Sequence, residues 1–153
     1  MEILEIVKAF TPAFLGIVGI VITVIYSAAN KKLNHQKMEK DLFKEFNERY
    51  NDLNEDLKKI NKNTSTEQLQ TLKSEKDDKK TLELVVIDYF NLCAEEYYWK
   101  KRKRISEEIW NAWHDGMMYY YNFPAVKNLW KTECESGWRS YYLDEKEDFF
   151  NLG

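Results

Sequence analysis

One uncharged stretch, AFTPAFLGIVGIVITVIYSAA, constrains the fold more than any other feature and covers Ala9 to Ala29. As a helix, its 21 residues would be about 31 Å long, close to the ~30 Å hydrocarbon thickness of a bilayer. A cleaved signal peptide would carry a basic segment before a shorter apolar core, whereas this stretch follows Glu2 and Glu5. The sequence therefore predicts a transmembrane helix within residues 1–30.

Lysines are distributed unevenly around this segment. Four of them follow it, at Lys31, Lys32, Lys37 and Lys40, and only Lys8 precedes it. By the positive-inside rule, this asymmetry predicts that the C-terminal part of the chain lies in the cytoplasm. Lys31, Lys32 and Lys37 are accordingly the predicted anchors at the membrane interface, in contact with lipid.

Small or weakly polar residues recur within the span at spacings of three or four. They are Gly16, Gly19, Thr23, Ser27 and Asn30. This small-residue stripe lies on one helix face, where it allows neighbouring helices to approach closely. In a ring of copies, the same stripe could line a narrow water-filled pore instead. Both interpretations predict a homo-oligomer, and the sequence does not separate pore lining from helix packing.

A second pattern follows in residues 31–62, where apolar side chains recur at spacings of 4, 4, 3, 4 and 3. These residues are Leu42, Phe46, Tyr50, Leu53, Leu57 and Ile60. The spacing predicts an amphipathic linker helix that continues the span, with a nearly heptad seam. Its other face alternates in charge, which is typical of a solvated helix side.

The remaining segment, residues 63–153, is rich in aromatic side chains. Between Tyr89 and Phe150 lie 17 of the 23 aromatic residues, including all five tryptophans. Helical spacing of apolar residues continues through Thr81–Trp99, and no run alternates as a half-buried strand does. We therefore predict an all-α fold, with one N-terminal transmembrane helix followed by a cytoplasmic, aromatic-rich helical bundle.

Local signals predict where three of these helices begin. Ser65 with Gln68 three residues later has the pattern of a capping box. Ser106 precedes two glutamates, which favour the positive end of a helix, and Pro124 suits a first helical position.

Motifs that would carry catalysis are missing from the sequence. It has no Gly-rich phosphate loop, no HExxH and no CxxC, and two histidines with two cysteines favour no metal site. We therefore expect no enzymatic activity and no cofactor. Cys93 and Cys134 lie in apolar helical contexts, which favours a reducing compartment.

Three polar residues of the aromatic segment, Glu95, Glu96 and His114, lie in contexts that favour structural roles. Adjacent helical residues point about 100° apart, so Glu95 and Glu96 are not expected to converge as an acid/base pair. Glu96 lies beside the apolar face and is predicted to pair with a cation from a neighbouring helix. His114 is interpreted as a surface histidine with a local hydrogen bond.

Five consecutive cations, Lys100, Lys101, Arg102, Lys103 and Arg104, form a basic pentad between aromatic residues and two glutamates. The flanking segments are acidic, so no basic surface extends from the pentad, and direct nucleic-acid binding is unexpected. The pentad is interpreted first as a turn between two helices. Contact with an acidic neighbouring subunit is the second interpretation, and RNA or anionic lipid is the third.

The stretch Tyr89–Tyr121 resembles a family of small bacterial membrane-anchored helical domains of unknown function. The resemblance extends more loosely over residues 80–143. The positions that carry it are Tyr89, Phe90, Glu95, Glu96, Tyr97, Tyr98, the turn Lys101–Arg104, Ile105, Trp110 and Trp113.

The architecture is also similar to that of the membrane accessory proteins of type VI-B CRISPR systems. That resemblance implies a span followed by a divergent HEPN-like domain, assembled as a pore in the bacterial inner membrane. It further implies membrane depolarisation that strengthens antiviral defence once an RNA-guided RNase meets viral RNA. The HEPN nuclease pattern, an arginine and a histidine separated by four to six residues, is absent, because nine residues separate Arg104 from His114.

The sequence is therefore compatible with three functions. The first is a homo-oligomeric pore-forming or gating protein of antiviral defence. The second is a membrane-tethered adaptor that binds a cytoplasmic partner protein without a pore. The third, a membrane-anchored nuclease, lacks the expected motif.

Overall fold

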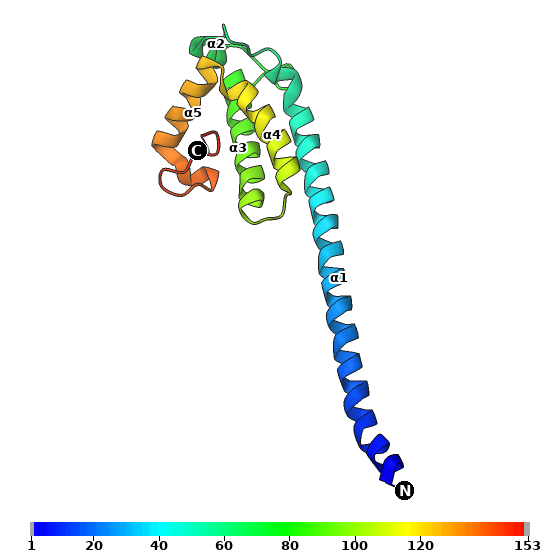
Figure 1. Ribbon diagram of the computed structural model, residues 1–153. Coiled ribbons are helices and arrows are strands. Elements are labelled where there is room, and N and C mark those ends of the chain that lie inside the picture. Colours follow the sequence, from blue (N-terminus) through cyan, green and yellow to red (C-terminus); the bar gives the residue numbers. More distant parts are fainter. Residues whose placement is uncertain (1, 152–153) are drawn as a thin grey trace. The chain divides into compact units, whose positions relative to one another are not determined.

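The computed structural model describes residues 2–151, which form five α-helices and one 3-10 turn (Figure 1). Apart from a single bridge between Lys73 and Thr81, these residues contain no β-structure. The all-α prediction is therefore confirmed. The elements are α1 (Glu2–Leu57), α2 (Thr66–Thr71), α3 (Leu82–Lys101), α4 (Glu107–Tyr121), α5 (Pro124–Gly137) and η1 (Trp138–Tyr141).

The chain divides into two compact units, Met1–Lys40 and Asp41–Gly153. Helix α1 runs without interruption through the predicted span and into the predicted linker, and it ends at Leu57. The second unit contains the last turns of α1 together with all later elements. Residues 41–57 of α1 therefore lie in the same compact unit as the later helices.

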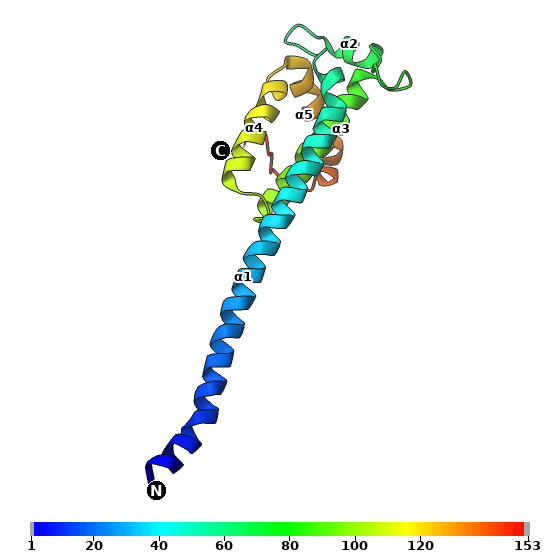
Figure 2. The ribbon, with the colours of Figure 1, turned by 90° about the vertical axis from the view of Figure 1, so that its right-hand side faces the viewer.

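The apolar seam of α1 packs within the second unit. Leu42, Phe46 and Leu57 are buried, and Ile60 is buried just beyond the helix. Figure 2 shows this part of α1 in front of α3. Tyr50 of α1 lies against Tyr89 of α3, with ring centroids 6.4 Å apart. The 4-4-3-4-3 spacing thus identified the face of α1 that the bundle covers.

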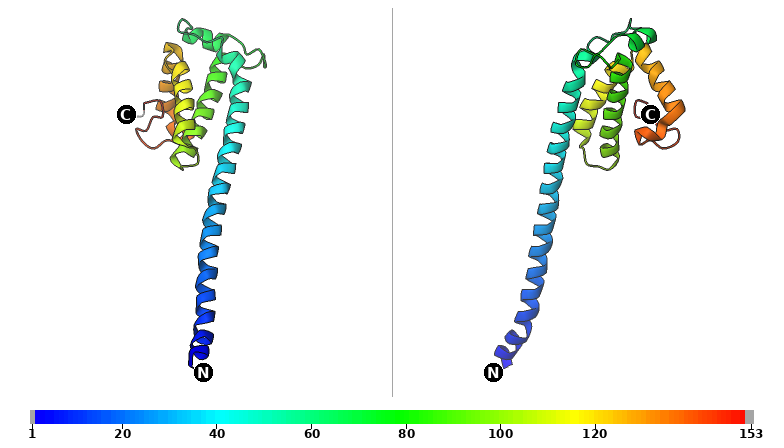
Figure 3. Two further views of the ribbon diagram at one scale, coloured as in Figure 1. Left: turned by 45° about the vertical axis from the view of Figure 1, so that its right-hand side comes forward. Right: turned by 180° about the vertical axis from the view of Figure 1, so that it is seen from behind.

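Helix α2 begins with the capping box that the sequence predicts. The Ser65 hydroxyl accepts a hydrogen bond from the Gln68 backbone N–H at 3.1 Å, and the Gln68 side chain accepts one from the Ser65 N–H at 2.8 Å. These two bonds satisfy donors that a helix start leaves unpaired. Figure 3 shows α2 beside the ends of α3 and α5 from two further sides.

Helix α3 is the central element of the second unit. It begins after Thr81, whose hydroxyl accepts a hydrogen bond from the Leu84 N–H, and it contacts α2, α4, α5 and η1. Phe90 and Cys93 are fully buried on it. The prediction of a central buried helix over Thr81–Trp99 is confirmed.

The C-terminal segment after η1 completes the aromatic core. Phe149 and Phe150 are buried, and both rings lie about 5 Å from the Trp130 ring of α5, at 4.8 and 5.0 Å. Phe150 also stacks on Tyr121 of α4 at 4.2 Å. Aromatic pairs of this geometry contribute roughly 0.5 to 1.5 kcal/mol each beyond their burial. The concentration of aromatic residues in the sequence therefore reflects an interior core.

The starts of α4 and α5 agree with the sequence, with one difference in detail. Pro124 occupies the first turn of α5, as predicted. Ser106 occupies the N-cap position of α4, but its hydroxyl makes no capping hydrogen bond there. The acidic first turn, Glu107 and Glu108, remains as the local feature that favours this helix start.

The basic pentad covers the last two residues of α3 and the first three residues of the turn that leads to α4. Lys103 adopts the left-handed conformation with φ of 55°, and its N–H donates to the Lys100 carbonyl at 2.9 Å. The Arg104 N–H donates to the Trp99 carbonyl at 3.0 Å. This pair of bonds is a Schellman motif, which usually has glycine at the left-handed position.

Replacing Lys103 with glycine is expected to raise the free energy of unfolding by about 0.5 to 1 kcal/mol, because glycine adopts this conformation without crowding at Cβ. The Lys103 side chain is exposed, and contacts between exposed charges contribute little. Denaturant unfolding followed by circular dichroism measures the change. The control, Lys131→Gly within α5, should lower the same free energy by about 1 kcal/mol. Equal losses from both variants would contradict the prediction.

Candidate functional site

The first unit presents the apolar segment of α1 without cover from the described chain. The large apolar side chains from Phe14 to Ile25 are 37% to 66% exposed. From Phe14 onward, α1 is long and apolar enough to cross a membrane, criteria that a signal sequence near an N-terminus also meets. Lys31, Lys32 and Lys37, the predicted interface anchors, are exposed in the turns that follow.

The small-residue stripe follows one side of this continuous helix. Gly16, Gly19, Thr23 and Ser27 are exposed, and Asn30 is half-buried. The Thr23 hydroxyl donates to the Gly19 carbonyl at 2.8 Å, so its donor is satisfied within the helix. An added Cβ at Gly16 or Gly19 would meet no atom of the described chain within 4 Å. The space beside these glycines is therefore open in a single copy.

The basic pentad, predicted as a candidate subunit interface, makes several contacts inside its own unit. Lys100 lies 3.4 Å from Glu107 of α4, which agrees with the turn interpretation. The Arg102 guanidinium lies 4.4 Å from the centroid of the Tyr98 ring. Lys103 and Arg104 are exposed in the turn.

Lys101 connects the pentad to the C-terminal segment. Its ammonium group lies 2.8 Å from Glu147 and 3.4 Å from Asp144. Glu147 also accepts a hydrogen bond from the Tyr97 hydroxyl at 2.6 Å. Although burial acts in the other direction, these hydrogen bonds lower the pKa of Glu147 below its usual range. One pentad residue therefore helps to hold the segment that completes the core.

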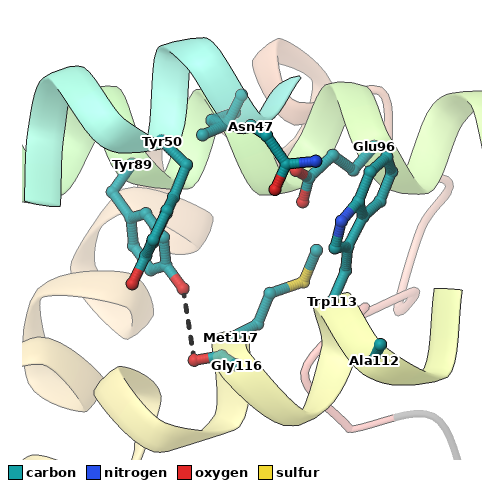
Figure 4. A pocket seen from close by; sticks show the side chains of 9 residues that line it. Asn47, Tyr50, Tyr89, Glu96, Ala112, Trp113, Gly116 and Met117 are labelled. Atoms are coloured by element: carbon teal, nitrogen blue, oxygen red, sulfur yellow. Dashed lines mark hydrogen bonds between the residues drawn. The ribbon is translucent and has the colours of Figure 1, made fainter. Parts of the chain in front are cut away.

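A cavity of about 190 Å³ lies between α1, α3 and α4 of the second unit, and the sequence alone did not reveal it. Figure 4 shows its polar groups, with the Glu96 carboxyl between the Asn47 side chain and the Trp113 ring. Glu96 is 6% exposed. The lining residues are Asn47, Tyr50, Tyr89, Leu92, Glu96, Ala112, Trp113, Gly116 and Met117.

The structure corrects the predicted pairing of the two adjacent glutamates. It is Glu95 that forms the ion pair, accepting two hydrogen bonds from the Arg49 guanidinium at 2.6 and 2.9 Å. Glu96 points toward the cavity, and among the described residues no hydrogen bond reaches its carboxyl group. The prediction that Glu96 pairs with a cation is therefore wrong. The 100° between successive helical side chains directs one glutamate to Arg49 and the other into the cavity.

Burial without a partner raises the pKa of Glu96 to about 8. Arg49 opposes this increase and Glu95 adds to it. Asp56, also buried, shows the opposite behaviour. Although burial alone would raise its pKa, hydrogen bonds from Ser74, Glu75 and Lys59 lower it below the usual range. Of these two buried carboxyl groups, Glu96 is therefore the one that exchanges a proton near neutral pH.

His114 also differs from its predicted environment. Its Nε2 atom lies 3.0 Å from the Phe149 carbonyl oxygen, 35 residues further along the chain. The expectation of a local hydrogen bond is therefore wrong, because the C-terminal segment returns to α4. The described residues contain no cluster of three or more His, Cys, Asp or Glu side chains that could hold a metal ion.

No protein-family model, curated protein or solved structure matches this chain.

Replacing Glu96 with glutamine is expected to stabilise the fold increasingly as the pH rises. The unfolded chain titrates near the ordinary glutamate pKa of 4.5, whereas the native state keeps the proton to about pH 8. Between these values the native state binds more protons, so its stability falls with increasing pH. Glutamine removes this loss, which should reach roughly 2 to 4 kcal/mol at pH 8.

Thermal unfolding of the full chain in detergent, measured from pH 5 to pH 8, tests this dependence. The control, Glu95→Gln, breaks the Arg49 pair and should destabilise the fold across the whole range. A pH-independent difference between Glu96→Gln and the wild type would refute the assignment.

Proposed function

We propose that this chain is a single-pass protein of the bacterial inner membrane that assembles into homo-oligomers and forms or gates a pore. The observation that carries the proposal is the exposure of the apolar part of α1. An apolar helix this long needs cover by lipid, by other copies, or by both. The opening stretch of α1 is accordingly the proposed membrane span.

The proposed orientation has the second unit in the cytoplasm. Lys31, Lys32 and Lys37 directly follow the span and are exposed, as side chains that reach a lipid headgroup region would be. Cys93 and Cys134 are free thiols, which is compatible with a reducing compartment.

The small-residue stripe is the proposed contact face between copies and the proposed pore lining. Gly16 and Gly19 leave open space into which a neighbouring helix can pack. Thr23, Ser27 and Asn30 tolerate water better than the aliphatic residues around them. The Thr23 hydroxyl already donates a hydrogen bond within its own helix. Its donor would therefore need no further partner in the wall of such a pore.

The biological setting follows only from the resemblance to type VI-B CRISPR accessory proteins. We propose that pore opening depolarises the inner membrane and so strengthens the response of an RNA-guided RNase to viral RNA. Neither direct RNA binding nor enzymatic activity is part of this proposal.

The alternative function is a membrane-tethered adaptor that binds a partner protein. It is favoured by large apolar or aromatic side chains that remain exposed on the second unit, since such groups often mark contact surfaces. They include Phe43, Leu84, Tyr119 and Tyr142.

Replacing Thr23 or Ser27 with leucine is expected to lower ion flux by roughly fivefold or more, because apolar side chains favour dewetting of a narrow pore. The measurement uses full-length protein in liposomes with a potential-sensitive dye. The control, Ile25→Leu, changes the opposite helix face and should leave the flux unchanged.

Wild-type protein that leaves the liposomes sealed at every protein density would contradict the pore. Equal flux in the wild type and in both leucine variants would contradict the proposed lining. A sealed membrane combined with capture of one defined partner protein by the full chain would favour the adaptor.

A further inference from the structure

We propose that the cavity beside Glu96 is a binding site for a small organic cation carrying an alkylammonium group. The volume of the cavity limits the size of the ligand. Its volume of about 190 Å³ lies below the roughly 300 to 1,000 Å³ typical of sites for drug-sized molecules. It therefore suits a group with only a few non-hydrogen atoms.

The walls of the cavity are aromatic on several sides. Tyr50, Tyr89 and Trp113 come from three different helices and face the same space (Figure 4). The faces of aromatic rings carry negative electrostatic potential, and together such rings form the cages that recognise substituted ammonium groups. Met117 adds a polarisable thioether to this lining.

These rings are held in place by contacts behind them. Trp113 stacks on Phe43 at 5.9 Å and meets the edge of Phe46 at 5.6 Å. Tyr89 packs against Tyr120 at 5.6 Å, and its hydroxyl donates to the Gly116 carbonyl at 3.5 Å. The cage is therefore formed before any ligand enters, which lowers the entropic cost of binding.

The carboxyl group of Glu96 supplies the charge that selects a cation. The residue is only 6% exposed, and its carboxyl group points into the open space of the cavity, where no hydrogen bond from a described residue reaches it. Arg49, the cation whose charge acts on this carboxyl, is engaged in two hydrogen bonds to Glu95. A buried carboxylate without a partner is unfavourable, and a bound cation would remove that cost.

Cation binding should be coupled to release of the Glu96 proton. The ionisable groups around this carboxyl are Arg49 and Tyr50 on α1 and Tyr89, Cys93 and Glu95 on α3, whereas α4 lines the cavity with non-ionisable residues only. Because the pKa of Glu96 is about 8, the carboxylate form increases roughly fivefold between pH 7 and pH 8. The affinity for the cation should increase by the same factor.

The experiment titrates tetramethylammonium chloride into full-length protein in maltoside detergent, whose head group carries no ammonium. Calorimetry and tryptophan fluorescence follow binding at constant ionic strength, with sodium chloride and uncharged tert-butanol as comparison ligands. We expect saturable binding with a Kd on the order of 1 mM, as a ligand this small allows. We expect no saturation with either comparison ligand.

The matched variants are Glu96→Gln, which keeps the shape of the side chain, and Glu108→Gln, which changes an exposed glutamate of α4. Glu96→Gln should weaken binding at least tenfold, and Glu108→Gln should leave it unchanged. Trp113→Leu, as a second variant, should weaken binding while circular dichroism shows a folded helical protein.

Three results would overturn the proposal. The first is absence of saturation by tetramethylammonium at pH 8, and the second is equal tetramethylammonium affinity in Glu96→Gln and the wild type. The third is a tert-butanol affinity equal to that of tetramethylammonium, which would identify a purely apolar cavity.

A comparison of nanodiscs distinguishes two sources of the ammonium group. If phosphatidylethanolamine discs weaken ethylammonium binding relative to phosphatidylglycerol discs, a lipid head group occupies the site. If both discs give the same affinity, the site takes a free cation. Ethylammonium binding that fails to saturate in either disc would count against the site.

Discussion

The structure depends above all on how the apolar part of α1 is covered. Nine large apolar side chains between Phe14 and Ile25 are exposed in the described chain. At roughly 1.5 to 3 kcal/mol for each buried side chain, their exposure to water would cost on the order of 14 to 27 kcal/mol. That amount matches or exceeds the roughly 5 to 15 kcal/mol that typically separates folded from unfolded domains. Water is therefore an unfavourable solvent for this segment, and the proposals on membrane and self-association both follow from this constraint.

The second unit accommodates its buried carboxyl groups in two different ways. Asp56 is buried with donors from Ser74, Glu75 and Lys59, so its charge is stabilised. Glu96 is buried beside an open space and keeps its proton instead. The Glu96 carboxyl group weakens the fold above neutral pH. A role in binding would explain why the protein retains it, because functional sites commonly contain locally unfavourable groups. The proposed ammonium site gives Glu96 such a role.

Much of the fold could be predicted from local sequence patterns. The seam from Leu42 to Leu57, the Ser65 capping box and the Pro124 helix start each depend on neighbouring residues, and the structure confirms them. The candidate site was less predictable, because its contacts join distant segments. A buried acid seven residues after Tyr89, on the same helix face, was the available indication of the cavity. Whether Glu95 or Glu96 pairs with Arg49 depends on how α1 packs against α3. The spacing of residues along the sequence does not reveal that packing.

The most direct measurement is the native mass of the full-length protein released from membranes in mild detergent. Coverage of α1 by other copies predicts a discrete particle whose mass is a multiple of 18.4 kDa. It also predicts dissociation when Gly16 and Gly19 are both replaced by leucine, since the larger side chains would occupy the space into which a neighbouring helix packs. A mass of 18.4 kDa at every protein concentration would contradict self-association through α1.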